Sequence, residues 1–173
     1  ISSFLGTWSS SINLWSILFR LLLSIIFSGL VGWERSSKRH AAGLRTFILV
    51  SMGATLAMTI DLILIEKLST GLWLISTATI IGIAIISANT LLYSSKNQIK
   101  GLTTSVALWV TAIIGLLFGT GYYTVALIIG IVFICVLSLV PPIERYLKNK
   151  SNHFEFHLEL KSASNLKDFI TII

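Results

Sequence analysis

The sequence predicts an all-α membrane protein, a bundle of about five transmembrane helices. Of its 173 residues, 54% are hydrophobic and only 12% are charged, and the mean hydropathy is +0.88. A soluble domain is about a quarter charged, so lipid is the expected solvent for most of this chain. The net charge of +6 does not indicate nucleic-acid binding, because the basic residues lie beside apolar stretches rather than in a separate basic domain.

Five apolar stretches are candidate membrane spans, since a spanning helix needs about 20 mostly apolar residues. They lie at residues 12–33, 44–65, 72–93, 104–119 and 122–140. Gly121 and its neighbours leave only a very short turn between the last two. Pro141 and Pro142 are expected to end the fifth helix, because proline lacks the amide proton that a helix uses and restricts the residue before it.

The charged loops predict the orientation of the chain. The loop at 34–46, ERSSKRHAAGLRT, carries four Lys and Arg residues against one acid, and further basic residues follow the third and fifth spans. Such loops stay in the cytoplasm. We therefore expect the N-terminus outside, the C-terminus inside, and the 34–46 loop against anionic lipid headgroups.

The residues after the spans divide into two parts. A transmembrane domain at 1–143 is followed by a basic linker at 144–150 and by a segment at 151–173. Apolar and polar residues alternate from Phe154 to Leu160, which predicts a strand, and a helix is predicted from Leu166. One strand and one helix cannot form a core. We expect either the start of an incomplete cytoplasmic α+β domain or a segment that docks on a partner.

Arg20 and Asp61 are the two charged residues inside the predicted spans. Charges at this depth are costly and are usually paired or functional. Counting from the 34–46 loop at about 1.5 Å per residue places their α-carbons within roughly 6 Å of each other in depth, and their side chains lean toward each other. We hypothesise an ion pair in the outer half of the bundle. The alternative is that both side chains snorkel separately to the outer surface.

Small residues recur at the spacing that helix packing uses. Gly115 and Gly119 form a G-x-x-x-G pair, Gly53 starts a similar pair of small residues, and Gly29 and Gly32 lie near the end of the first span. Small residues let helix backbones approach closely in lipid. We expect these glycines to pack within the bundle. Dimerisation, which would make a homo-oligomer, is the alternative.

The pattern of a catalytic, cofactor or metal site is missing from the sequence. His40 lies in the basic loop, and Cys135 lies in an apolar run with no partner for a disulfide or a metal. Asp61 is the only acid well inside a span, whereas a magnesium site usually needs several oxygen ligands. We therefore predict no catalytic residue, no metal ligand and no cofactor, and we expect that the protein is not an enzyme.

Three motifs together resemble the MgtC/SapB family of bacterial inner-membrane proteins. They are GLVGWER at 29–35, AGLRT at 42–46, and GLTT at 101–104 running into ALWVTA at 107–112. The motif residues of interest are Glu34, Arg35, Gly43, Arg45, Thr46, Gly101, Thr103, Thr104 and Trp109. Arg35 and Arg45 could hold anionic headgroups or an acidic surface of a partner, with topology anchoring alone as the alternative. Thr103 and Thr104 are expected to open the fourth helix, because threonine is a good N-cap.

The resemblance covers about residues 14–140 and implies about five transmembrane helices in the bacterial inner membrane. It also implies that 151–173 begins an ACT-like domain. Family members are linked to magnesium limitation, acid tolerance and virulence, and several act by binding other membrane proteins. The third span departs from the family pattern: the run at 81–89 reads IGIAIISAN, and most of the glycines and polar groups of the family are replaced.

We therefore expect a non-enzymatic inner-membrane regulator or scaffold of the MgtC/SapB type, which binds another membrane protein and serves adaptation to magnesium or acid stress. The alternative is a transporter for magnesium or another cation, which would need a polar path through the bundle. A membrane enzyme is a third class, and it would need a polar cleft.

Overall fold

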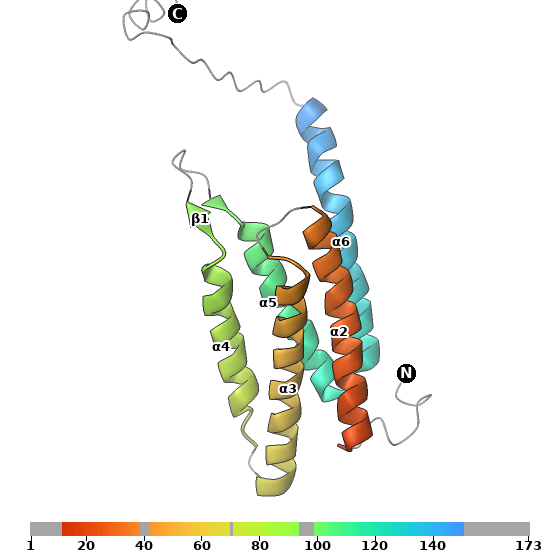
Figure 1. Ribbon diagram of the computed structural model, residues 1–173, viewed down its shortest axis with the longest axis vertical. Coiled ribbons are helices and arrows are strands. Elements are labelled where there is room, and N and C mark those ends of the chain that lie inside the picture. The colour runs from red at the N-terminus through yellow and green to blue at the C-terminus, as the bar shows by residue number, and fades with distance from the viewer. Residues whose placement is uncertain (1–11, 39–41, 70, 94–98, 151–173) are drawn as a thin grey trace, which may run out of the picture. The chain divides into compact units, whose positions relative to one another are not determined.

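The computed structural model describes residues 12–38, 42–69, 71–93 and 99–150 (Figure 1). Five helices form in this part of the chain: α2 (Leu14–Ser37), α3 (Leu44–Leu68), α4 (Leu74–Ala88), α5 (Leu102–Thr120) and α6 (Tyr123–Lys150). Two short strands, β1 (Leu92–Tyr93) and β2 (Ile99–Lys100), pair antiparallel between α4 and α5. The chain divides into two units, residues 1–138 and residues 139–173.

Four of the five helices, α2, α3, α5 and α6, are long and apolar enough to cross a membrane, as judged by length and composition. The helix α4 is also apolar but has 15 residues. The all-helical fold class that the sequence predicted is confirmed. The third span is shorter than predicted, because α4 begins after Trp73 and ends before Asn89.

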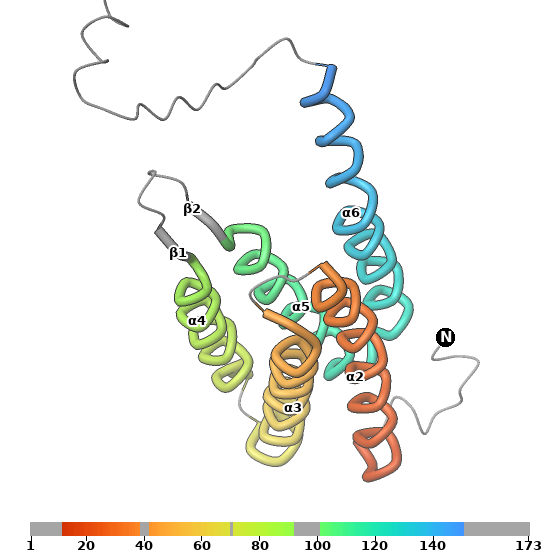
Figure 2. Tube along the Cα trace, turned by 45° about the horizontal axis from the view of Figure 1, so that its top comes forward, coloured from red at the N-terminus to blue at the C-terminus, as the bar shows by residue number. Residues whose placement is uncertain are grey.

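The first unit is a bundle in which α3 and α5 are central. The helix α3 contacts α2, α4 and α5, and α5 likewise contacts both α2 and α4 (Figure 2). The core contains Phe27 and Val31 of α2, Phe47 of α3, Leu108, Ile114 and Phe118 of α5, and Tyr123 and Ala126 of α6. Phe27 packs on Phe118 with ring centroids 5.9 Å apart, and its ring fills the space beside Gly130 of α6.

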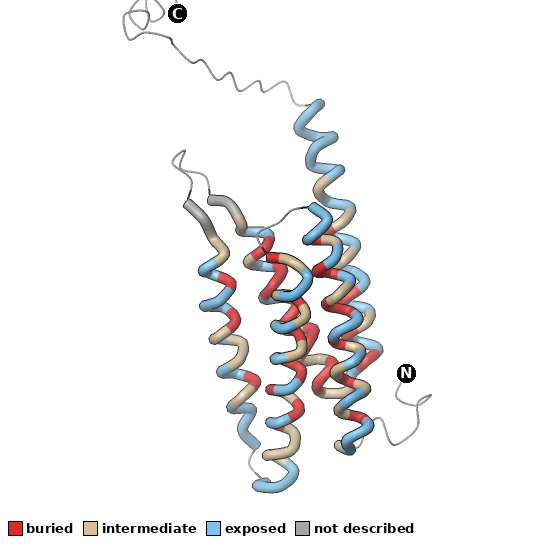
Figure 3. The backbone as a smooth tube through the Cα atoms, in the orientation of Figure 1, coloured by how far each residue is buried: buried red, intermediate tan, exposed pale blue. Residues whose placement is uncertain are grey.

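The outside of the bundle carries many large apolar side chains, and its inside contains many polar ones. Large aliphatic side chains such as Leu22, Ile81 and Val132 are more than half exposed, whereas several serines and threonines, two arginines and one aspartate are buried. Figure 3 shows that buried and exposed positions alternate along each helix of the bundle. Water would not tolerate this distribution over so much surface, but lipid favours it. The pattern of burial therefore agrees with the multi-pass membrane protein that the composition predicted.

The helix ends explain two features of the loops. Gly101 and Gly121 precede and follow α5 with φ of 91° and 84°, a left-handed conformation that glycine adopts at little cost. A β-carbon at Gly101 would lie 2.4 Å from the carbonyl oxygen of Thr90. Gly101 is therefore the N-cap residue of α5, which begins at Leu102, and Thr103 and Thr104 lie in the first turn of the helix. The predicted threonine N-cap is wrong.

A second correction concerns the fifth helix. Pro141 and Pro142 do not end α6, which continues through both prolines to Lys150. The residues after the prolines include good helix formers such as Glu144, Arg145 and Leu147, which favour continuation of the helix. The strand predicted at 154–160 and the helix predicted from Leu166, and with them the α+β segment at 151–173, lie outside the described residues.

Candidate functional site: a polar seam between three helices

A row of buried hydroxyl groups joins α2, α3 and α5. Ser24 Oγ of α2 lies 2.8 Å from Ser51 Oγ of α3, and Thr55 Oγ1 lies 2.9 Å from Ser24 Oγ. Thr55 Oγ1 also lies 2.9 Å from the carbonyl oxygens of Ser51 and Gly115. We call Ser24, Ser51, Thr55 and the Gly115 carbonyl the polar seam. All three hydroxyl side chains have 0% exposure.

The polar seam was not predicted from the sequence, although the spacing of its residues in α3 is visible there. Ser51, Thr55 and Thr59 recur at four-residue spacing in α3, which places them on one helix face. Thr59 donates to the Thr55 carbonyl, and Ser28 donates to the Ser24 carbonyl. A buried Ser or Thr in a helix can satisfy its hydroxyl in this way, so the spacing alone does not reveal which hydroxyls bond to a neighbouring helix.

Gly115 and Gly119 allow α5 to approach α3 at the seam. A β-carbon at Gly115 would lie 2.5 Å from the carbonyl oxygen of Ser51, and one at Gly119 would lie 2.6 Å from the β-carbon of Met58. The G-x-x-x-G pair thus packs inside the bundle, as expected from its spacing. Glycine is needed here because the bonds of the seam form only when the two backbones are this close.

The remaining predicted packing glycines differ in their surroundings. A β-carbon at Gly32 of α2 would lie 2.7 Å from the α-carbon of Leu44, so Gly32 fixes the approach of α2 to the start of α3. Gly29 has only Ile48 within contact distance. Gly53 of α3 is exposed and has no atom within 4 Å of an added β-carbon. Within the described part of the chain, Gly53 therefore has no packing role.

Arg20 binds at the end of α5. Its side chain is only 1% exposed, and Nη1 donates to the carbonyl oxygen of Gly119 at 2.7 Å. Its guanidinium also packs against Gly121. The last carbonyls of a helix lack intrahelical donors and carry partial negative charge. A buried cation at this position therefore closes the C-terminus of α5.

Asp61 binds at the start of α4. Its Oδ1 accepts the backbone N–H of Ile75 at 2.9 Å, and its Oδ2 accepts that of Ser76 at 2.7 Å. Asp61 thus caps a neighbouring helix from α3, where the free N–H groups favour a carboxylate. The predicted ion pair is not the arrangement found for these two described side chains. The depths were similar, but each charge meets a helix terminus instead.

The basic loop begins with a small charged cluster at the end of α2. Glu34 lies 3.3 Å from the buried Arg35 and also pairs with Lys38 one turn later. The side chain of Ser36 accepts the backbone N–H of Leu44 at 2.9 Å, and this bond ties the end of α2 to the start of α3. Arg35 therefore lies in the protein interior. A residue that only anchored the topology of the chain would not need to be buried.

An open groove of about 380 Å³ lies at the start of α3. Its described lining consists of Ser36, Gly43, Leu44, Arg45 and Thr46. The side chain of Arg45 is exposed, and the N–H groups at a helix start favour anions. Four residues of the AGLRT motif, at positions 43–46, therefore line a groove that suits anionic groups.

The motif before the fourth predicted span is split between the interior and the surface. Thr104 is buried and Thr103 is exposed. Trp109 is 40% exposed and lines a shallow groove with Ser105 and Ser87. The structure brings Thr104 and Trp109 to different faces of α5, so the GLTT–ALWVTA motif does not form one cluster.

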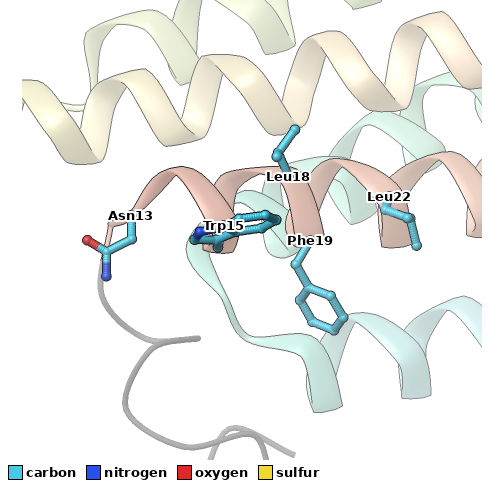
Figure 4. Close-up of a pocket in the computed structure, with 5 residues that line it drawn as sticks. All are labelled: Asn13, Trp15, Leu18, Phe19 and Leu22. Atoms are coloured by element: carbon cyan, nitrogen blue, oxygen red, sulfur yellow. The ribbon is translucent and has the colours of Figure 1, made fainter.

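A larger groove of about 530 Å³ runs along the first half of α2 (Figure 4). Its described lining residues are Asn13, Trp15, Leu18, Phe19 and Leu22. Phe19 meets Tyr123 of α6 edge-to-face with centroids 5.5 Å apart. The groove is apolar apart from Asn13 at one end, which suits hydrocarbon rather than a polar substrate.

The chemistry available at the seam is hydrogen bonding between helices. Its hydroxyls bond to one another and to carbonyls, and both oxygens of Asp61 accept backbone N–H groups. In the part of the chain that the structure describes, no group of three or more His, Cys, Asp or Glu residues could hold a metal.

Comparison with known proteins gives consistent results. The model of the MgtC family matches residues 21–146. A protein of Escherichia coli K12 with the name "Putative magnesium transporter YhiD" is 31% identical over 158 residues, which cover 88% of this chain and 73% of that protein. Protein MgtC of Brucella abortus is 29% identical over 126 residues, 72% of this chain and 51% of that protein. No solved structure matches the chain.

Proposed function

The chain belongs to the MgtC family, and from this premise we propose that it is a non-enzymatic regulator or scaffold of the bacterial inner membrane. It acts by binding another membrane protein and serves adaptation to magnesium or acid stress. The family membership supports the link to magnesium, and the packing of the bundle supports a binding role rather than catalysis or transport.

The observation that carries this proposal is the closure of the polar seam. An ion path needs oxygen ligands that face an open route. The seam hydroxyls instead bond to each other at 2.8–2.9 Å, with α5 pressed against α3 at Gly115. Such a network holds three helices in one arrangement, because partly broken networks are costly in a low dielectric. A rigid bundle with an apolar outer surface suits recognition by other helices in the membrane.

The basic loop is proposed to fix the orientation of the bundle. With Lys38 and Arg45 in the cytoplasm, by the positive-inside rule, the N-terminus lies outside and α6 ends inside. The groove at the start of α3 then faces the anionic inner leaflet, where Arg45 and the helix N–H groups attract phosphate headgroups.

Photo-crosslinking in native membranes tests the proposal. A photoreactive amino acid is placed at an exposed position of α3 (Gly53), of α4 (Ile81) or of α6 (Val132), and crosslinked products are identified by mass spectrometry. A buried position, Ala54, serves as the control. We expect one discrete membrane-protein adduct from at least one exposed position. Only lipid adducts from all three positions would contradict the proposal.

Cation transport is the second candidate, because the name of the Escherichia coli relative contains it. Transport would make Asp61 a ligand of the moving ion. It therefore predicts saturable Mg²⁺ uptake by proteoliposomes that Asp61→Asn abolishes. The regulator proposal predicts uptake no faster than in protein-free liposomes, with or without that substitution.

A further inference from the structure

The last twelve residues of α6 have one apolar face and one polar face. At 100° per residue, an arc of about 120° contains only apolar residues up to position 147: Leu139, Val140, Ile143, Tyr146 and Leu147. The opposite side carries Glu144, Arg145, Lys148 and Asn149. Lys150, the last residue, returns to the apolar side, where its long stem can snorkel. All five apolar side chains are exposed by 48–67%.

The length of α6 exceeds what a bilayer requires. Its 28 residues span about 42 Å at about 1.5 Å per residue, whereas the hydrocarbon core is about 30 Å thick. About eight residues therefore extend beyond the hydrocarbon. If the span begins at Tyr123, the extension begins near Ile143, and every charged residue of α6 lies within it.

Two prolines stand where the span ends and the extension begins. Pro141 and Pro142 have no N–H group, so the carbonyls of Leu137 and Ser138 lose their usual helical donors. The boundary between the two units of the chain lies three residues earlier, between Ser138 and Leu139. Two backbone hydrogen bonds of α6 are therefore missing near the level where the helix leaves the hydrocarbon.

We propose that Ile143–Lys150 is an interfacial helix that binds an anionic lipid surface, with Ile143, Tyr146 and Leu147 against the acyl boundary. Two features select lipid as the occupant of the apolar face. The segment continues directly from a membrane-spanning helix, and its three basic residues against one acid complement anionic headgroups. Glu144 is itself paired with Lys148 at 3.1 Å. Pro141 and Pro142 provide the joint that lets the segment follow the surface.

A second copy of the chain fits the apolar face less well. Stable coiled coils need about three to four heptads, and twelve residues supply fewer than two. Tyr146 also favours the boundary between headgroups and acyl chains, where aromatic residues with a polar tip are enriched.

Depth measurements with a fluorescent label test the proposal on the whole 173-residue chain. The only cysteine, Cys135, is replaced by alanine, and bimane is attached to Leu147→Cys on the apolar face or to Asn149→Cys on the polar face. The protein is reconstituted in phosphatidylcholine, with or without phosphatidylglycerol. Quenching by brominated lipids and by aqueous iodide is then measured.

With phosphatidylglycerol, we expect brominated lipid to quench the label at 147 and iodide to quench the label at 149. The double variant Arg145→Gln, Lys148→Gln removes two of the three basic charges of the segment. It should reduce the population of segments bound to the lipid surface about five-fold for each charge removed. Equal iodide access at 147 and 149 would overturn the proposal. The proposal would also be overturned if a second copy of the chain shielded the label at 147, which energy transfer between labelled copies would reveal. It would likewise be overturned if deletion of residues 151–173 removed the shielding. The measurement involves no partner protein, so its outcome is independent of the regulatory function.

Discussion

Replacing Gly115 with alanine tests whether α3 and α5 approach each other as closely as the seam requires. The added β-carbon would lie 2.5 Å from the Ser51 carbonyl oxygen and 3.1 Å from the Ala54 β-carbon. Ordinary contact begins at 3.4 Å, so the helices must separate by about 0.9 Å to restore normal packing. Thr55 Oγ1 and the Gly115 carbonyl, now 2.9 Å apart, would then be too far apart for a good hydrogen bond.

The expected cost follows from two terms. Overpacking a close-packed interior costs about 1–3 kcal/mol, and a hydrogen bond between membrane helices contributes about 0.6 kcal/mol on average. We therefore expect the free energy of unfolding to fall by about 2–3 kcal/mol. Gly53→Ala is the matched control, because nothing lies within 4 Å of its added β-carbon. Helix propensity alone should then raise stability by about 0.5–1 kcal/mol.

The assay is reversible unfolding of the purified chain in mixed micelles titrated with dodecyl sulfate, followed by circular dichroism and tryptophan fluorescence. The two variants make the same chemical change in neighbouring helices of one bundle. The reasoning would be refuted if Gly115→Ala unfolded at the same detergent fraction as Gly53→Ala.

Three further substitutions separate the contributions to the site. Thr55→Val removes the bonds to Ser24 and Gly115 and should lower the free energy of unfolding by about 1–2 kcal/mol in the same titration. Thr59→Val is the control and should cost less, because the Thr59 hydroxyl bonds within α3. Equal costs for the two variants would contradict the role of the polar seam. Asp61→Asn should weaken the cap of α4 by about 1 kcal/mol and speed hydrogen exchange of the backbone amides in the first turn of α4. Unchanged exchange at those amides would show that the cap is dispensable. Arg20→Met should cost about 1.5–3 kcal/mol, because the Gly119 carbonyl loses a charged donor; a variant as stable as the parent would contradict that role.

The sequence predicted the helical class and the approximate positions of the five described helices, four of which are long enough to span a membrane, because apolar patterning is a local property. Apolar length and loop glycines are readable one segment at a time, as at Gly121. The end of α6 was predicted wrongly for a related reason. The two prolines remove hydrogen bonds locally, but the favourable helix formers beyond them were given too little weight.

The site was harder to predict because it depends on which helix faces which. The sequence singled out Arg20 and Asp61 as the charged residues inside the predicted spans and predicted similar depths for them. Depth does not specify the direction around a helix axis, however, and the two side chains turn to the ends of α5 and α4. Ser24 and Thr55 are ordinary residues in sequence. Their importance arises only when Gly115 brings the third helix within hydrogen-bonding distance.

Chemical access to the seam tests the central claim most directly. In the Cys135→Ala background, Ser24→Cys and Ser51→Cys are each treated in intact membranes with a charged, water-soluble methanethiosulfonate reagent, and Lys38→Cys is the exposed control. Because the seam is buried and its hydroxyls bond to one another, we expect Lys38→Cys to react and both seam variants to remain unmodified from either side. Rapid modification of Ser24→Cys or Ser51→Cys, slowed by millimolar Mg²⁺, would show an open polar path and contradict the account.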